Sequence, residues 1–148
     1  MHTDLDTQIT HDGNNRTDVA YEVPFPLVLA EHLVLITRVK STGIETPRTS
    51  GYTFTPQVDG NGRITGGNVL TNPAIPTTSS LILKRVTPKT QLLNLTSGGA
   101  FGAETFESSI DKLVMIMQEI VRDVDAADTA LSARINALTA RVTTLEQP

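Results

Sequence analysis

The hydrophobic residues in the last third of the chain recur at steps of three and four between residues 106 and 145. This heptad spacing is typical of a helix that pairs with other helices in a coiled coil. The eleven seam residues are Phe106, Ile110, Leu113, Met117, Ile120, Val124, Leu131, Ile135, Leu138, Val142 and Leu145. One doubled step of four, from Ala127 to Leu131 to Ile135, is a stutter that relaxes the supercoil locally but leaves the apolar face continuous. The pattern predicts one long helix in an oligomer.

The two halves of this predicted helix differ in the residues beside the seam. In the first half the flanks are also apolar, at Val114, Ile116 and Val121, which predicts contact with a third helix or a globular neighbour. In the second half the flanks are small or charged, and Arg141 and Glu146 are spaced to pair between neighbouring helices. Seam chemistry alone leaves the number of helices open, whereas the continuous seam and its wide first half together predict a parallel homotrimer. The alternative is a long helix whose apolar stripe packs against the head of its own chain.

Residues 1–103 contain short β-prone runs separated by turn residues and show almost no helical period. The clearest runs are 33–39 and 80–87, and residues 59–62 form a turn signal between two further strands. The chain is therefore predicted to be α+β, with a small antiparallel β-sandwich-like head over residues 1–103. Residues 104–148 follow as a long C-terminal helix that forms a trimeric coiled-coil stalk.

Charge and composition narrow the class of protein. The net charge is −4, and all of it lies in residues 104–148, since residues 1–103 carry eight acidic and eight basic residues. A neutral head on an acidic stalk is a poor partner for a phosphate backbone, so no nucleic-acid binding is expected. No apolar run is long enough to span a membrane and the first residues are polar, so we expect neither a signal peptide nor a membrane anchor.

The sequence matches none of the common catalytic or metal-binding motifs. The chain has no cysteine, and its three histidines stand beside no credible nucleophile. The segment from Asp59 begins like a calcium loop but has Ile64 and Leu70 where that loop needs glycine and glutamate. The glycines Gly60, Gly62 and Gly66 miss the dinucleotide-binding spacing. We therefore expect no enzyme activity, no cofactor and no metal site.

Four stretches carry a further pattern. They are Asp12–Arg16 with Tyr21–Pro26 and the run 33–38, then Tyr52–Phe54, then Lys84–Pro88 with Thr90 and Gln91, and last Ser97–Phe101 ahead of Met117–Glu119. In this order and spacing, across roughly residues 9–122, the chain resembles the N-terminal domain of tail fibre and tailspike proteins of T7-like podoviruses. The resemblance implies a structural protein of the virion, located in the bacteriophage tail, that supports host attachment.

The resemblance also implies partners. It implies a homotrimer that plugs a receptor-binding fibre into the tail by contacting the tail's tubular adaptor and nozzle proteins, and any chemistry would lie in a C-terminal remainder of the fibre. The residues we expect on the tail-binding surface of the head are Arg16, Pro24, Phe25, Lys84, Arg85 and Lys89.

Two alternatives stay open at this point. The chain is either the start of a longer fibre or a complete, free-standing coiled-coil adaptor that recruits a separate spike protein. A fragment of a capsule-degrading tailspike enzyme is the alternative from another class, although two tyrosines and no tryptophan offer few stacking faces for a sugar.

Overall fold

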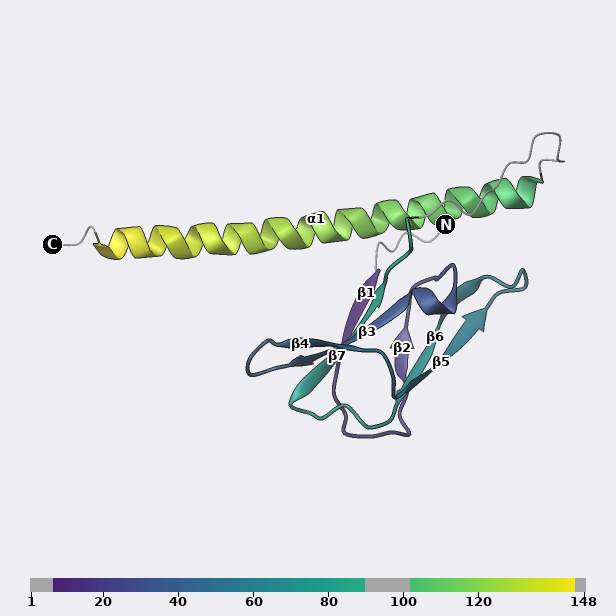
Figure 1. Ribbon diagram of the computed structural model, residues 1–148, viewed down its shortest axis with the longest axis horizontal. Coiled ribbons are helices and arrows are strands. Elements are labelled where there is room, and N and C mark those ends of the chain that lie inside the picture. The colour runs from purple at the N-terminus through teal and green to yellow at the C-terminus, as the bar shows by residue number, and fades with distance from the viewer. Residues whose placement is uncertain (1–6, 90–101, 146–148) are drawn as a thin grey trace.

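The computed structural model describes residues 7–89 and 102–145, which form two antiparallel sheets and one long helix (Figure 1). The elements are β1 (Gln8–Asp12), β2 (Tyr21–Val23), the 3-10 turn η1 (Ala30–His32), β3 (Leu33–Val39), β4 (Glu45–Arg48), β5 (Tyr52–Val58), β6 (Ile64–Thr71), β7 (Ser79–Arg85) and α1 (Ala103–Leu145). The predicted α+β class, with antiparallel sheets followed by a single long C-terminal helix, is confirmed. The helix begins one residue before the predicted boundary at 104, whereas the division into two domains remains a prediction.

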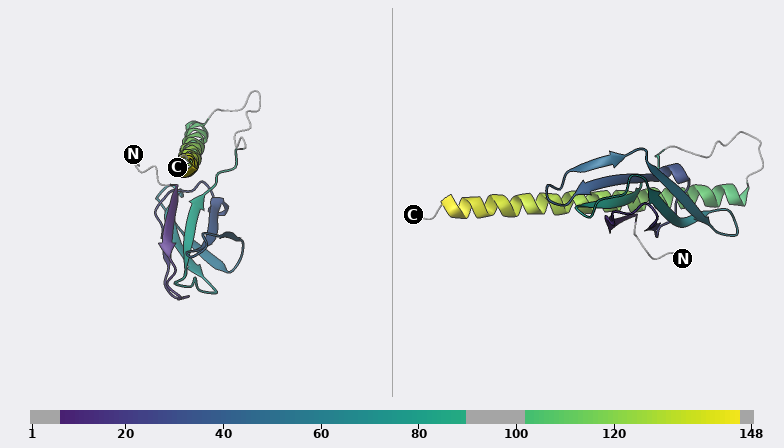
Figure 2. Two further views of the ribbon diagram at one scale, coloured as in Figure 1. Left: turned by 90° about the vertical axis from the view of Figure 1, so that its left-hand side faces the viewer. Right: turned by 90° about the horizontal axis from the view of Figure 1, so that it is seen from below.

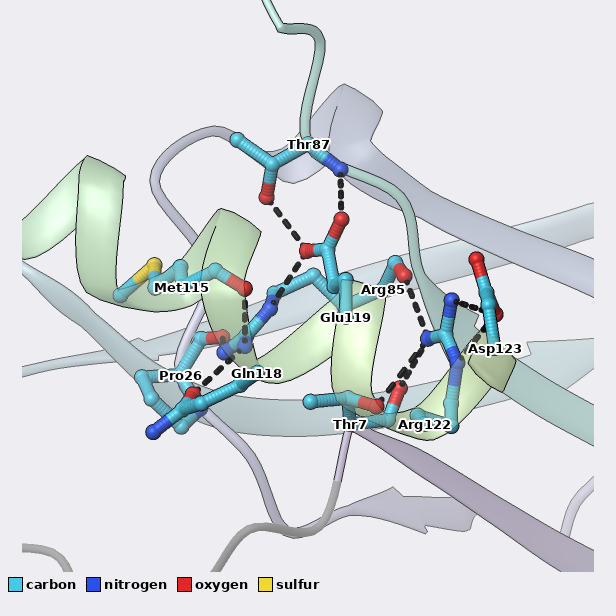
Figure 3. A network of polar contacts seen from close by, with 9 residues as sticks. All are labelled: Thr7, Pro26, Arg85, Thr87, Met115, Gln118, Glu119, Arg122 and Asp123. Carbon is cyan, nitrogen blue, oxygen red and sulfur yellow. Dashed lines mark hydrogen bonds and ion pairs between the residues drawn. The ribbon is translucent and has the colours of Figure 1, made fainter. Parts of the chain in front are cut away.

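The first sheet has the strand order β1, β7, β3, β4, and the second has the order β2, β6, β5. Strand β7 lies between β1 and β3, with Ile82 opposite both Thr10 and Ile36, and nearly all of its side chains are buried. In the second sheet the β5–β6 hairpin turns at the Asp59–Gly62 signal, where Asp59 accepts hydrogen bonds from the Asn61 and Arg63 amides. The last residue of β7, Arg85, lies at the edge of the head that meets α1 (Figures 1 and 3).

One hydrophobic core joins the two sheets. Its members come from β2, β3, β6, β7 and the loops between them, and are Tyr21, Val23, Phe25, Leu27, Leu33, Leu35, Val69, Ile75, Leu81 and Leu83. The leucines of the predicted runs 33–39 and 80–87 supply this core from alternate positions of each strand, because successive side chains of a strand point to opposite faces. Strands β1 and β4 are edge strands that the hydrophobic pattern did not indicate, because their exposed polar residues give no such alternation.

Helix α1 crosses the end of the head with its first half and extends beyond it with its second half (Figures 1 and 2). The view along the helix in Figure 2 shows the whole head on one side of the helix axis. The identity of the helix face that meets the head therefore decides which face remains open to a partner.

Candidate interaction site: an apolar helix face opposite a buried polar junction

All eleven predicted seam residues are exposed in this chain. Their exposed fractions range from 43% at Ile110 to 84% at Leu145, and the flanking Val114 and Val121 are exposed as well. An exposed apolar face of this length is typical of a surface that binds another protein. The face runs the length of α1 and is broken only by the small residue at the stutter, Ala127.

The head packs on the other side of the helix. The residues of α1 that are buried or that bond to the head include Lys112, Glu119 and Arg122. At about 100° of turn per residue, Lys112 and Glu119 lie roughly 120–140° around the helix from the centre of the seam. The sequence predicts that the apolar flanks of the first half contact a third helix or a globular neighbour. Val114 and Val121 do not pack on the head of their own chain, because both are exposed, and contact with a third helix stays a prediction. The head packs on the polar face of the helix instead, where its own polar and charged groups, such as Thr87 and Arg85, find hydrogen-bond partners.

An ion pair between β7 and α1 forms the centre of this contact (Figure 3). Arg85 is 0% exposed and Glu119 is 5% exposed, and the Arg85 Nε atom donates a hydrogen bond of 2.9 Å to the Glu119 Oε1 atom. Thr87 completes the coordination of this carboxylate, since its amide donates to Oε2 at 2.9 Å and its hydroxyl donates to Oε1 at 2.6 Å. Each oxygen of the buried carboxylate thus has a donor, which a buried charge requires.

The guanidinium of Arg85 binds both the head and the helix. It donates to the Pro26 carbonyl at 3.0 Å, to the Gln118 side-chain oxygen at 2.8 Å and to the Met115 carbonyl at 3.3 Å (Figure 3). Burial lowers the pKa of Arg85, and the hydrogen bond and charge of Glu119 oppose that shift. A guanidinium is charged at any ordinary pH, so the junction is a true buried ion pair. We call the group Arg85, Thr87, Gln118 and Glu119 the latch.

A second contact lies one turn further along α1. Arg122 donates to the Arg85 carbonyl at 3.0 Å and to the Thr7 hydroxyl at 3.1 Å, which ties the helix to the start of β1 (Figure 3). Arg122 also pairs with Asp123 at 2.7 Å, and Lys84 lies 3.7 Å from the same carboxylate. Partial burial of Asp123 raises its pKa, but the hydrogen bonds and charges of Arg122 and Lys84 outweigh burial and hold that pKa below its usual value.

A third contact joins the β5–β6 hairpin to the first turns of α1. Arg63 lies 3.1 Å from Asp111 and 3.7 Å from Glu107, and all three side chains are about half exposed. Solvent weakens such pairs, so this contact orients the helix more than it stabilises it.

The predicted tail-binding residues do not form one surface. Arg16, Pro24 and Lys89 are exposed, and Arg16 pairs with Asp18 at 2.7 Å. Lys84 is half-buried beside Asp123. Phe25 is 1% exposed in the core, and Arg85 is the buried centre of the latch. The expectation that Phe25 and Arg85 offer exposed side chains to a tail protein is thus not met, because the core and the latch enclose them.

The motif stretches meet in space. Lys84–Pro88 supplies Arg85 and Thr87, Met117–Glu119 supplies Gln118 and Glu119, and the first stretch supplies the Pro26 carbonyl. These stretches carry the family resemblance in the sequence, but the sequence alone does not indicate that they meet at one contact. The signal available in the sequence was the position of Gln118 and Glu119, which are polar although much of the surrounding half of the helix is apolar. The stretch Ser97–Phe101, together with Thr90 and Gln91, lies outside the described residues.

Other chemistry is limited in the described part of the chain. Residues 7–89 and 102–145 hold no cluster of three or more His, Cys, Asp or Glu side chains that could bind a metal ion. Among the same residues no helix is sufficiently long and apolar to cross a membrane. A surface hollow of about 300 Å³ beside Tyr52, Thr71 and Asn72 has no charged side chain in its lining.

Comparison with known proteins gives no relative. No protein-family model matches the chain, and the search of curated proteins finds no match. The apolar helix face and the latch therefore carry the functional argument.

Proposed function

We propose that the chain is an assembly module, in which α1 pairs with α1 of further copies while the head is held outside the bundle. The observation that carries this proposal is the continuous exposed face of eleven seam residues, opposite a helix face that the head already occupies. Burying that face stabilises an oligomer by about 25 cal/mol per Å² of apolar surface. With the head on the far side, several helices can meet without a head between them.

The assembly we propose is a parallel homotrimeric coiled coil. The exposed Val114 and Val121 widen the face beyond the seam, and a wide face favours more than two helices. A parallel, in-register arrangement also places the stutters of all copies at one level, so the supercoil relaxes at the same height in every helix. A β-sandwich-like head is part of the same proposal, supported by the single core that the two sheets share.

The role we propose is that of the tail-attachment module of a tail fibre or tailspike of a podovirus. The motif order supports it, and so does the convergence of three motif stretches at the latch, which gives those residues a structural reason to occur together. In this role the head binds the tail's tubular adaptor and nozzle proteins, and the trimeric rod carries the receptor-binding part of the fibre. A trimer suits such a load because each chain buries apolar surface that it would expose on leaving.

The experiment is co-sedimentation of the purified chain with tail particles that lack fibres. We expect the chain to occupy the fibre sites and to block later attachment of full-length fibres. Reversing the charge of the exposed candidates, in Arg16→Glu with Lys89→Glu, should weaken occupancy, whereas Lys40→Glu, an exposed lysine outside the candidate set, should not. Failure of the unmodified chain to co-sediment would contradict the proposed role.

The same preparation separates the alternatives. A reducing-sugar assay on host capsular polysaccharide and lipopolysaccharide should release no sugar, and release would favour the tailspike-enzyme alternative. Capture of a separate spike protein by tail-bound chain would favour the free-standing adaptor.

A further inference from the structure

His32 is a buried histidine beside the latch. It is the last residue of η1 and is 5% exposed, and its Nδ1 atom has no hydrogen-bond partner among the residues that the structure describes. Its carbonyl oxygen accepts a hydrogen bond of 2.8 Å from the amide of Val86, the residue between Arg85 and Thr87. The histidine is therefore fixed by its backbone to the segment that binds Glu119.

The charges around the imidazole come from three elements. Glu31 lies on η1 itself, Lys112 and Glu119 lie on α1, and Arg85 on β7 is bound to Glu119. Two of these charges belong to α1, and the backbone places His32 close to them, since Val86 bonds to the His32 carbonyl and the next residue, Thr87, bonds to Glu119. Lys112 is 4% exposed and disfavours a second cation nearby. Both Glu119 oxygens already accept hydrogen bonds from Arg85 and Thr87, and Glu31 is exposed to solvent.

We propose that the contact between head and helix is a pH-responsive latch, in which protonation of His32 releases α1 from the head. A charged imidazole carries two N–H donors, and the Nδ1 donor has no acceptor in the closed junction. Burying it unpaired beside Lys112 costs free energy that release into water recovers. The seam residues lie on the opposite helix face and carry no titrating group, so the oligomer persists while the heads turn outward.

The direction of the pH effect follows from the same contacts. Burial, reinforced by Lys112, lowers the pKa of His32 in the docked state, whereas in the released state it returns toward about 6.5. The released state thus binds more protons, and docking is favoured at higher pH. Docking is at full strength above about pH 6.5 and weakens as the pH falls toward the lowered pKa. Each unit of that lowering changes the ratio of docked to released chains about tenfold.

The absence of cysteine allows a direct test on the full chain. Thr46→Cys on β4 and Ala130→Cys on the outer face of α1 place two spin labels at exposed positions. Labelled chain is diluted into excess unlabelled chain, and the distance distribution is measured from about pH 8 to about pH 5. We expect one narrow distribution above pH 6.5, and a second, broader population that grows below it. The nitrogen NMR titration of the His32 imidazole, recorded in parallel, should follow the growth of that population.

Two variants complete the test. His32→Gln is neutral at every pH and should lose the pH response, whereas His11→Gln should keep it, because His11 on β1 bonds to the Glu22 carbonyl on β2, away from the latch. The proposal is overturned if His32→Gln keeps the wild-type pH response. It is also overturned if the heads stay docked at pH 5, or are released while the wild-type imidazole is still neutral.

Discussion

The contacts of the latch predict how much the loss of Arg85 lowers the free energy of unfolding. Arg85→Met removes a guanidinium that is 0% exposed and replaces it with an unbranched apolar side chain. Glu119 then keeps only the two hydrogen bonds from Thr87, and its carboxylate remains buried without a countercharge at Oε1. The Gln118 side-chain oxygen and the Pro26 and Met115 carbonyls each lose the hydrogen bond that Arg85 donates.

The expected cost is large. Removing one partner of a buried ion pair typically destabilises a protein by about 3–5 kcal/mol, because the other charge stays buried and unpaired. Replacing both partners, in Arg85→Met with Glu119→Leu, removes the unpaired charge and should recover most of that loss. The two substitutions should thus be strongly non-additive, with the double variant more stable than Arg85→Met alone.

The neighbouring residue provides the control. Lys84 precedes Arg85 on β7, and its ammonium lies 3.7 Å from an Asp123 carboxylate that is largely exposed. An exposed pair contributes about 1 kcal/mol or less, so Lys84→Met should cost no more than that. The free energy of unfolding is measured by urea titration with far-UV circular dichroism, at one fixed chain concentration because association adds to apparent stability. Equal losses for Arg85→Met and Lys84→Met, or a double variant less stable than Arg85→Met, would refute the reasoning.

Two further predictions concern the seam and the head. Leu138→Asp should dissociate the oligomer, because one buried layer would hold an unpaired carboxylate from every chain at a cost of several kcal/mol each, while Ala137→Asp on the outer face should not. Sedimentation velocity compares the two, and dissociation by both would count against the assigned seam. Gly13→Ala should destabilise the head by at least about 1–3 kcal/mol, since an added Cβ would overlap the Pro76 carbonyl oxygen and lie 2.7 Å from that of Ser79. Gly60→Ala, with nothing within 4 Å, should leave the thermal midpoint almost unchanged.

Hydrophobic periodicity located the strand that supplies the core and the helix that carries the apolar stripe. The run 33–39 is strand β3, and the stripe from Phe106 to Leu145 lies on one helix that starts one residue before the predicted boundary at 104. Hydrophobic periodicity could not predict the edge strands β1 and β4. Their residues are mostly polar, and backbone pairing with β7 and β3 defines them as strands.

The junction could not be found from pattern alone. The sequence predicts Arg85 as a tail-binding residue at a basic strand end, and it presents Glu119 only as part of the stretch Met117–Glu119. A strand end and a helix 34 residues later meet only through the tertiary fold, which makes the pair one buried group. The face of α1 that meets the head also depends on the tertiary fold: the head packs on a polar face, Val114 and Val121 stay exposed, and their contact with a third helix stays a prediction.

Sedimentation equilibrium of the purified chain tests the central proposal, that the exposed face of α1 is closed by further copies. The chain has a mass of 15.9 kDa, and we predict a single species near three times that value which persists on dilution to micromolar concentration. A stable monomer at that concentration, with the apolar face of α1 open to water, would contradict the account.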